Sequence, residues 1–154
     1  MILITGGAGF IGSNFVNFVN RVYDDRIIVL DSLSYASDVN FIKKDTNIEF
    51  VWCDISNEKH VNHIFSKYEP NKVFHFAAQT QVKDALVDPL TTFNSNIKGT
   101  WNLLEICRQN NIPAVVASSD KAYGISKTLP YKEEFRLNGE FPYEVSKSIT
   151  DLLV

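Results

Sequence analysis

The chain has 154 residues, of which 45% are hydrophobic and 21% are charged, and its formal net charge at pH 7 is −3. This length suits one globular domain with a substantial core, and the mildly acidic balance excludes the basic surface that binding to nucleic acid or an anionic membrane requires. The apolar opening MILI is too short for a signal peptide or a membrane span, so we expect a cytoplasmic protein.

Short apolar runs alternate with segments of helical periodicity along the whole chain. Five runs are apolar enough to be buried strands: 1–4, 26–30, 48–52, 72–78 and 113–117. Four segments space their apolar residues as amphipathic helices do: 10–22, 60–69, 89–111 and a last helix that begins near Pro142. This alternation predicts an α/β fold with βαβ units and a doubly wound parallel sheet.

The two cysteines, Cys53 and Cys107, lie too far apart in the sequence for a metal-ligand or redox motif. We therefore expect two buried free thiols, a reducing compartment and no bound metal.

A glycine-rich turn, TGGAGFIG at 5–12, joins the first strand to the first helix. Its glycines fit G-x-G-x-x-G as Gly7, Gly9 and Gly12, and the related G-x-x-G-x-x-G as Gly6, Gly9 and Gly12. Glycines in this place let the backbone approach a pyrophosphate, which the N–H groups at the helix N-terminus then bind. The residues expected to hold a dinucleotide are Gly6, Gly9, Phe10, Ile11 and Gly12.

Asp31 ends the second predicted strand, downstream of this turn. A carboxylate there accepts hydrogen bonds from both ribose hydroxyls and repels a 2′-phosphate, which favours NAD over NADP. Asp54 and Ile55 follow the third strand similarly and are expected to meet the adenine edge, although the spacing fits a turn aspartate equally well.

The last predicted helix carries YEVSK, in which Tyr143 and Lys147 stand four residues apart on one face. A lysine ammonium beside a phenol favours the phenolate and can hold a ribose. Tyr143 can then take a proton from an alcohol while a hydride leaves the alcohol carbon. With Ser119 at the end of the fifth strand, these residues indicate a dehydrogenase-type site that uses NAD.

As a set, these motifs resemble the extended short-chain dehydrogenase/reductase superfamily, specifically its nucleotide-sugar epimerase/dehydratase group. The resemblance covers essentially the whole chain and is carried by TGGAGFIGSNFV, DSLSYA, DIS, HFAAQTQV, NSNIKGTWNLLE, SSDKAYG and PYEVSK. It implies a Rossmann-like sheet of five strands in the order 3-2-1-4-5. It also implies that further cofactor contacts come from Ala77, Ala78, Gln79 and Asn96.

The stretch SSDKAYG, residues 118–124, is similar to the form of this motif in 4,6-dehydratases. The resemblance implies that Tyr143 deprotonates the sugar 4-hydroxyl while NAD takes the C4 hydride and Ser119 holds the oxygen. Asp120 then protonates the departing 6-hydroxyl, Lys121 assists removal of the C5 proton, and NADH returns hydride to C6. A solvated turn pair is the alternative reading of Asp120 and Lys121.

The substrate nucleotide and the exact reaction stay open at this point. Lys121 and Gln79 are similar to CDP-glucose 4,6-dehydratases, whereas the N-terminal motifs look more like dTDP-glucose dehydratases. GDP-hexose dehydratases belong to the same group. A 4-epimerase, in which the Asp–Lys pair is incidental, and a non-catalytic NAD-binding fragment are the other readings.

Members of this group are considerably longer and add a small substrate-binding lobe. We therefore expect residues 1–154 to be the NAD-binding domain alone, with that lobe missing. The resemblance also implies a homodimer packed through the helix at 89–111 and the helix that begins near Pro142. His75, inside a strand, is expected to be a core histidine, and Lys83 a surface lysine.

Overall fold

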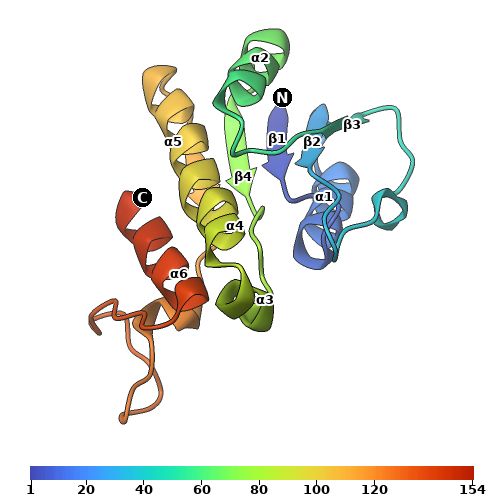
Figure 1. Ribbon diagram of the computed structural model, residues 1–154. Coiled ribbons are helices and arrows are strands. Elements are labelled where there is room, and N and C mark those ends of the chain that lie inside the picture. Colours follow the sequence, from blue (N-terminus) through green and yellow to red (C-terminus); the bar gives the residue numbers. More distant parts are fainter.

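The computed structural model describes residues 1–154, which form a single five-stranded sheet with helices on both faces (Figure 1). All strand pairs are parallel and their order is β3-β2-β1-β4-β5, which confirms the predicted Rossmann-like fold. The strands are β1 (Ile2–Thr5), β2 (Ile27–Asp31), β3 (Ile48–Trp52), β4 (Lys72–His75) and β5 (Ala114–Val116).

Six α-helices and three short helical turns accompany the strands, and the last turn and the last helix follow β5. The helices are α1 (Phe10–Val22), α2 (Glu58–Tyr68), α3 (Val82–Val87), α4 (Pro89–Phe93), α5 (Gly99–Gln109) and α6 (Pro142–Leu153). The turns are η1 (Val39–Phe41) and η3 (Asp120–Tyr123), which are 3₁₀-helical, and η2 (Asn94–Lys98), which is π-helical. No helix combines the length and the apolar character needed to cross a membrane.

Helices cover both faces of the sheet. Since alternate side chains of a strand point to opposite faces, one strand can contribute residues to two cores. On one face Leu3, Leu30 and Val73 pack in a core that includes α2 and α5. On the other, Ile4 and Val29 pack against α1, which Figure 1 shows away from α2 and α5. The strands β1 and β2 are buried throughout, as continuous apolar runs in a doubly covered sheet should be.

Cys53 and Cys107 are free and buried in the larger core, as predicted. Burial raises the pKa of each thiol to about 11. Both side chains therefore stay protonated at neutral pH and act as small apolar groups.

Most predicted elements agree with the structure to within two residues, and two differ by more. The fourth strand stops at His75, and the chain then passes directly beside the glycine turn: a Cβ at Gly6 would lie 2.5 Å from the Ala77 nitrogen. The helix predicted at 89–111 is divided into α4 and α5 by the π turn η2, which accommodates an extra residue. The short helix α3 was not predicted.

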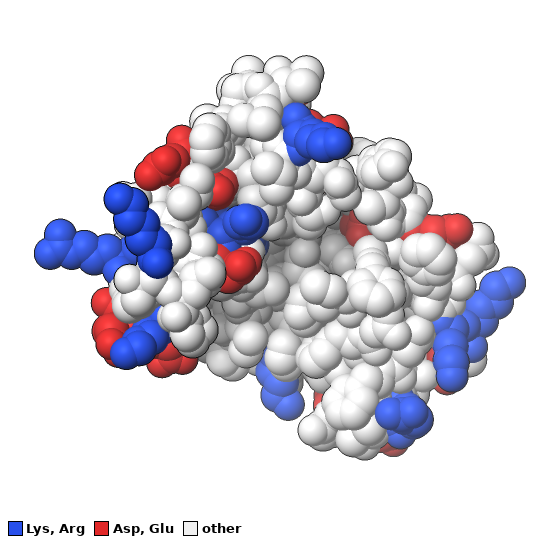
Figure 2. Space-filling view, turned by 90° about the horizontal axis from the view of Figure 1, so that it is seen from below, with Lys and Arg blue, Asp and Glu red and all other residues white.

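The parallel arrangement brings the carboxyl ends of all strands to one edge of the sheet, where open α/β folds bind their ligands. The loops that follow β1, β2, β4 and β5 meet at this edge (Figure 1). Figure 2 looks onto it and shows a hollow near the centre, with charged side chains on both sides.

Candidate functional site

The glycine turn between β1 and α1 is so tight that two of its glycines cannot be replaced without a clash against the backbone. Gly6 has φ +67, a left-handed conformation that favours glycine, and its missing Cβ leaves room for the backbone of Ala77. A Cβ at Gly12 would collide with the Gly6 carbonyl oxygen. At Gly7 the obstacle is only the Val29 side chain. The fold therefore requires glycine at Gly6 and Gly12, and Gly6 belongs only to the G-x-x-G-x-x-G pattern.

The N-terminus of α1 is open to a ligand. Gly9 is the N-cap, no side chain caps the helix, and no acidic residue occupies its first turn. The N–H groups of Phe10, Ile11 and Gly12 have no partner in the protein, and the side chains of Phe10 and Ile11 are 80% and 65% exposed. Free donors at the positive end of a helix dipole form an anion site, which fits a pyrophosphate.

Asp31 lies at the end of β2, next to the glycine turn, and only 7% of its surface is exposed. One carboxylate oxygen accepts the Ala8 N–H at 3.0 Å and the other accepts the Leu33 N–H at 2.9 Å. Each oxygen keeps a free lone pair, so the side chain is held rigidly and can still accept two ribose hydroxyls.

Asp54 and Ile55 both follow β3, but they differ in burial and in their contacts. Asp54 is exposed and its Oδ1 accepts the Ser56 N–H at 2.9 Å, which is a turn contact. Ile55 is buried and packs against Gly99 of α5. Both lie at the carboxyl edge of the sheet, and Asp54 is the one with a side chain open to solvent.

The loop after β4, with Ala77, Ala78 and Gln79, is tied to the π turn by a reciprocal amide pair. The Gln79 N–H donates to Asn96 Oδ1 at 2.7 Å, and Asn96 Nδ2 donates to the Gln79 carbonyl oxygen at 3.0 Å. The same Nδ2 donates to Ser146 Oγ on α6 at 2.9 Å. Asn96 is buried, so it fixes this loop against α6 rather than offering its amide to a ligand.

Tyr143 and Lys147 lie on α6, and both are more than nine-tenths buried. Burial raises the pKa of the Tyr143 phenol, the Ser119 hydroxyl opposes this shift by hydrogen bonding, and the Asp120 charge adds to it. Tyr143 therefore lies beside Ser119 and Asp120, the residues predicted to share its site.

Lys147 does not act on the phenol in this structure. Its ammonium donates to the Ala117 carbonyl oxygen at 2.9 Å. Burial lowers the pKa of Lys147, with Asp151 acting in the opposite direction. The ammonium has two further N–H donors, which leaves it able to hold a ribose while anchored to the end of β5.

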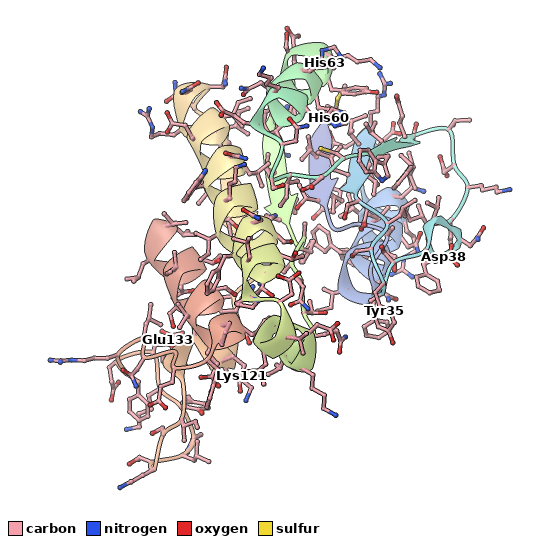
Figure 3. The ribbon with its side chains drawn as sticks, viewed as in Figure 1. Tyr35, Asp38, His60, His63, Lys121 and Glu133 are labelled. Carbon is pink, nitrogen blue, oxygen red and sulfur yellow. The ribbon has the colours of Figure 1, made fainter.

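Asp120 and Lys121 occupy the turn η3, directly after Ser119, whose Oγ accepts the Lys121 N–H at 3.2 Å. Both side chains are exposed, and Ser119 donates to Asp120 at 3.3 Å. Figure 3 shows Lys121 at the carboxyl edge of the sheet, between the start of α6 and α3. No carboxylate forms an ion pair with Lys121.

Several residues that hold this site together were not singled out from the sequence. Ser148 of α6 donates to the Ala122 carbonyl oxygen at 2.7 Å and so anchors η3 to the helix of Tyr143. The Asp38 N–H donates to the Ala8 carbonyl oxygen at 2.9 Å, which folds the loop after β2 back onto the glycine turn (Figure 3). Ser148 follows Lys147 directly in the YEVSK helix, and that adjacency is the signal that could have found it.

His75 is a buried core histidine, as predicted, and Lys83 is exposed. The His75 ring lies between two hydroxyls: Nδ1 is 2.6 Å from Thr5 Oγ1 and Nε2 is 2.9 Å from Thr100 Oγ1. Burial, with a smaller effect of the Lys147 charge, lowers the pKa of His75 to about 3. The ring is therefore neutral at physiological pH.

This shift predicts a loss of stability in mild acid. The unfolded chain protonates His75 below its ordinary pKa of about 6.5, whereas the folded chain does so only near 3. Stability is therefore fully present above pH 6.5 and falls as the pH drops towards 3. We expect the free energy of unfolding to fall by about 2 kcal/mol between pH 7 and pH 5 from this residue alone, as measured by urea denaturation.

His75→Gln is expected to flatten that decline. His63→Gln is the matched control, because His63 is exposed on α2, away from the site (Figure 3). An equally steep decline in wild type and His75→Gln would contradict the assignment.

Comparison with known proteins places this arrangement in a defined group. The chain matches the family model described as GDP-mannose 4,6 dehydratase over residues 3–154. The dTDP-glucose 4,6-dehydratase of Mycolicibacterium smegmatis is 37% identical over 158 residues, which cover 99% of this chain and 47% of that relative. The chain thus spans about half the length of the curated relatives it matches.

Solved structures of both reaction types superpose on the chain. A dTDP-glucose 4,6-dehydratase from Bacillus anthracis in complex with NAD gives a TM-score of 0.85 at 32% identity, covering 99% of this chain and 48% of the other. A UDP-Glc/GlcNAc 4-epimerase from Campylobacter jejuni gives 0.90 at 30% identity, covering 99% and 47%.

Proposed function

The chain belongs to the GDP-mannose 4,6-dehydratase family of the extended short-chain dehydrogenases/reductases, and on that premise we propose that it is the NAD-binding half of a nucleotide-sugar 4,6-dehydratase. One observation carries the proposal. The open glycine turn with its neighbouring carboxylate and the Ser119–Asp120–Tyr143 cluster lie at the same edge of the sheet.

The residues at this edge fit NAD. The turn offers a cradle that a Cβ at Gly6 or Gly12 would fill, and α1 offers unpaired N–H donors for the pyrophosphate. Asp31 would accept the adenosine ribose hydroxyls, and its charge would disfavour NADP. The loop of Ala77, Ala78 and Gln79 passes beside the turn and would line the cofactor. When bound, NAD would supply a hydride acceptor that later returns the hydride.

The chain's own side chains would handle the protons. Tyr143 would take the proton of the sugar 4-hydroxyl, and Ser119, whose hydroxyl lowers the pKa of the phenol, would hold the same oxygen. Lys147 would hold the nicotinamide ribose with the donors not used by Ala117. Oxidation at C4 makes the C5 proton acidic, which prepares the sugar for loss of water across C5 and C6.

The Asp–Lys pair is what favours dehydration over simple epimerisation. Asp120 is close enough to act on the Tyr143 phenol, so an acid that protonates the departing 6-hydroxyl would reach the same sugar. Lys121 follows it in the same turn and would assist removal of the C5 proton. CDP-, dTDP- and GDP-hexoses are the proposed substrates.

The test of this proposal is elimination activity in the 154-residue chain and in the longest natural polypeptide that contains it. With CDP-glucose, dTDP-glucose and GDP-mannose, we expect a 4-keto-6-deoxy product from one of them. Asp120→Asn should lower its formation about 100-fold, because the amide cannot give a proton to the leaving hydroxyl. Lys127→Met is the control, since Lys127 is exposed in the loop after η3. Full elimination activity in Asp120→Asn would contradict the assignment.

A 4-epimerase is the second candidate, favoured by the TM-score of 0.90 to the Campylobacter jejuni enzyme. It needs Tyr143 and Ser119 but no acid at Asp120. Sugar deuterated at C4 separates the two reactions: a dehydratase moves the label to C6, whereas an epimerase returns it to C4.

We extend the proposal to a cytoplasmic homodimer. Leu90, Trp101 and Leu152 are exposed apolar residues on α4, α5 and α6, the helices that correspond to the predicted interface, and a second copy would cover them. The two free buried thiols fit a reducing compartment such as the cytoplasm.

A further inference from the structure

A buried chain of hydrogen bonds runs through the ring of His75. The Ala77 N–H donates to Thr5 Oγ1 at 3.4 Å, and Thr5 Oγ1 lies 2.6 Å from His75 Nδ1. On the other side, His75 Nε2 lies 2.9 Å from Thr100 Oγ1, which donates to the Asn96 carbonyl oxygen at 2.6 Å. Thr5, His75, Thr100 and Asn96 are all at most 3% exposed.

The direction of these bonds follows from counting protons. The single hydroxyl proton of Thr100 goes to a carbonyl oxygen, which cannot donate, so Thr100 must accept from Nε2–H. A neutral ring with its proton on Nε2 has a bare Nδ1, which accepts the Thr5 hydroxyl proton. Thr5 in turn accepts the Ala77 N–H. One tautomer therefore satisfies every group along the chain.

The two ends of this chain reach the two halves of the site. At one end Thr5 directly precedes Gly6, whose missing Cβ leaves room for the Ala77 backbone and whose carbonyl oxygen lies against Gly12. At the other end is the π turn, where the Asn96 side chain holds Gln79 and also Ser146 of α6. Ser146 directly precedes Lys147 in the chain. A shift of the ring would thus move the cradle and α6 relative to one another.

We propose that His75 is a positioning residue: its neutral imidazole, protonated on Nε2, ties the glycine turn to the π turn and so sets the cofactor cradle at a fixed place relative to α6. This role rests on the proposed function, since the cradle is the proposed NAD site. A charged ring would break the arrangement, because Nδ1–H would then donate to Thr5 Oγ1 and the buried Thr5 hydroxyl proton would lose its acceptor. Lys147 is the charged group that acts on the ring, and its sign also opposes protonation.

The first arm of the test needs no cofactor. Long-range ¹H–¹⁵N NMR of the chain should show His75 as the neutral Nε2–H tautomer from pH 5 to pH 8. The Asn96 side-chain amide should be protected from hydrogen exchange in wild type and lose that protection in His75→Leu. An Nδ1–H tautomer, a charged ring or unchanged Asn96 protection would overturn the proposal, whether or not the chain binds NAD.

The second arm measures NAD affinity by calorimetry in two variants, each of which keeps one of the two hydrogen bonds that the His75 ring makes. His75→Gln can still donate towards Thr100, and His75→Asn can still accept from Thr5. We expect NAD affinity to fall about tenfold in both variants, because each breaks the tie between the glycine turn and the π turn at one end.

Val61→Ala, on the buried face of α2, is the control for general destabilisation and should leave NAD affinity unchanged. Equal affinities in His75→Asn and Val61→Ala would overturn the positioning role. If wild type itself binds no NAD, the proposed function fails and the NMR arm alone decides the role of His75.

Discussion

Tyr143→Phe is expected to lower the turnover of nucleotide sugar by about 10³-fold, with NAD affinity within about threefold of wild type. The substitution removes only the phenolic oxygen, and the buried ring keeps its packing in α6. The lost group is the proposed base for the sugar 4-hydroxyl, which NAD binding does not need. Steady-state kinetics and an NAD titration of the same preparation measure both quantities.

Lys147→Met is the variant to compare with Tyr143→Phe. Because Lys147 is proposed to hold the cofactor ribose, its loss should weaken NAD binding as well as turnover. Turnover above one tenth of wild type in Tyr143→Phe would contradict the role given to the phenol.

Gly12→Ala is expected to remove NAD binding and to destabilise the fold. The added Cβ would collide with the carbonyl oxygen of Gly6, which belongs to the backbone and cannot rotate away. We expect a loss of about 2 kcal/mol in the free energy of unfolding and a fall of at least about 100-fold in NAD affinity. Urea denaturation and calorimetry measure the two effects.

Gly9→Ala separates a direct effect on NAD binding from an indirect effect through loss of stability. A Cβ at Gly9 would lie 3.3 Å from the Gly6 carbonyl oxygen, which is tight but tolerable. This variant should keep most of its stability and still bind NAD poorly, because the methyl group occupies the place of the pyrophosphate. Wild-type NAD affinity in both variants would show that the turn is not the cofactor cradle.

The sheet could be predicted from the sequence because its signals are local. The apolar run RIIVL by itself predicts a buried strand. The glycines from Gly6 to Gly12 by themselves predict a turn between a strand and a helix. The order of the strands follows from the family resemblance, and the structure agrees.

The π turn at Asn94–Lys98 could not be predicted in this way. The apolar residues Phe93, Ile97 and Trp101 continue a regular helical spacing through it. What holds the extra residue is tertiary: the Asn96 side chain bonds to Gln79 and to Ser146, which are remote in sequence. Such a contact leaves no trace in local periodicity.

The Tyr143–Lys147 pair shows a similar limit within the site. Their spacing predicts one helix face, and the structure has them on α6. The spacing cannot predict where a long, flexible lysine side chain ends, and its ammonium donates to Ala117 instead of acting on the phenol. That contact depends on where the fold places the Ala117 carbonyl oxygen, directly after β5.

A calorimetric titration of the 154-residue chain with NAD and with NADP tests the central claim most directly. If the glycine turn and Asp31 form the cofactor site, one NAD binds per chain, and NADP binds at least about tenfold more weakly because Asp31 repels the 2′-phosphate. Absence of NAD binding, or equal affinity for the two dinucleotides, would contradict the account.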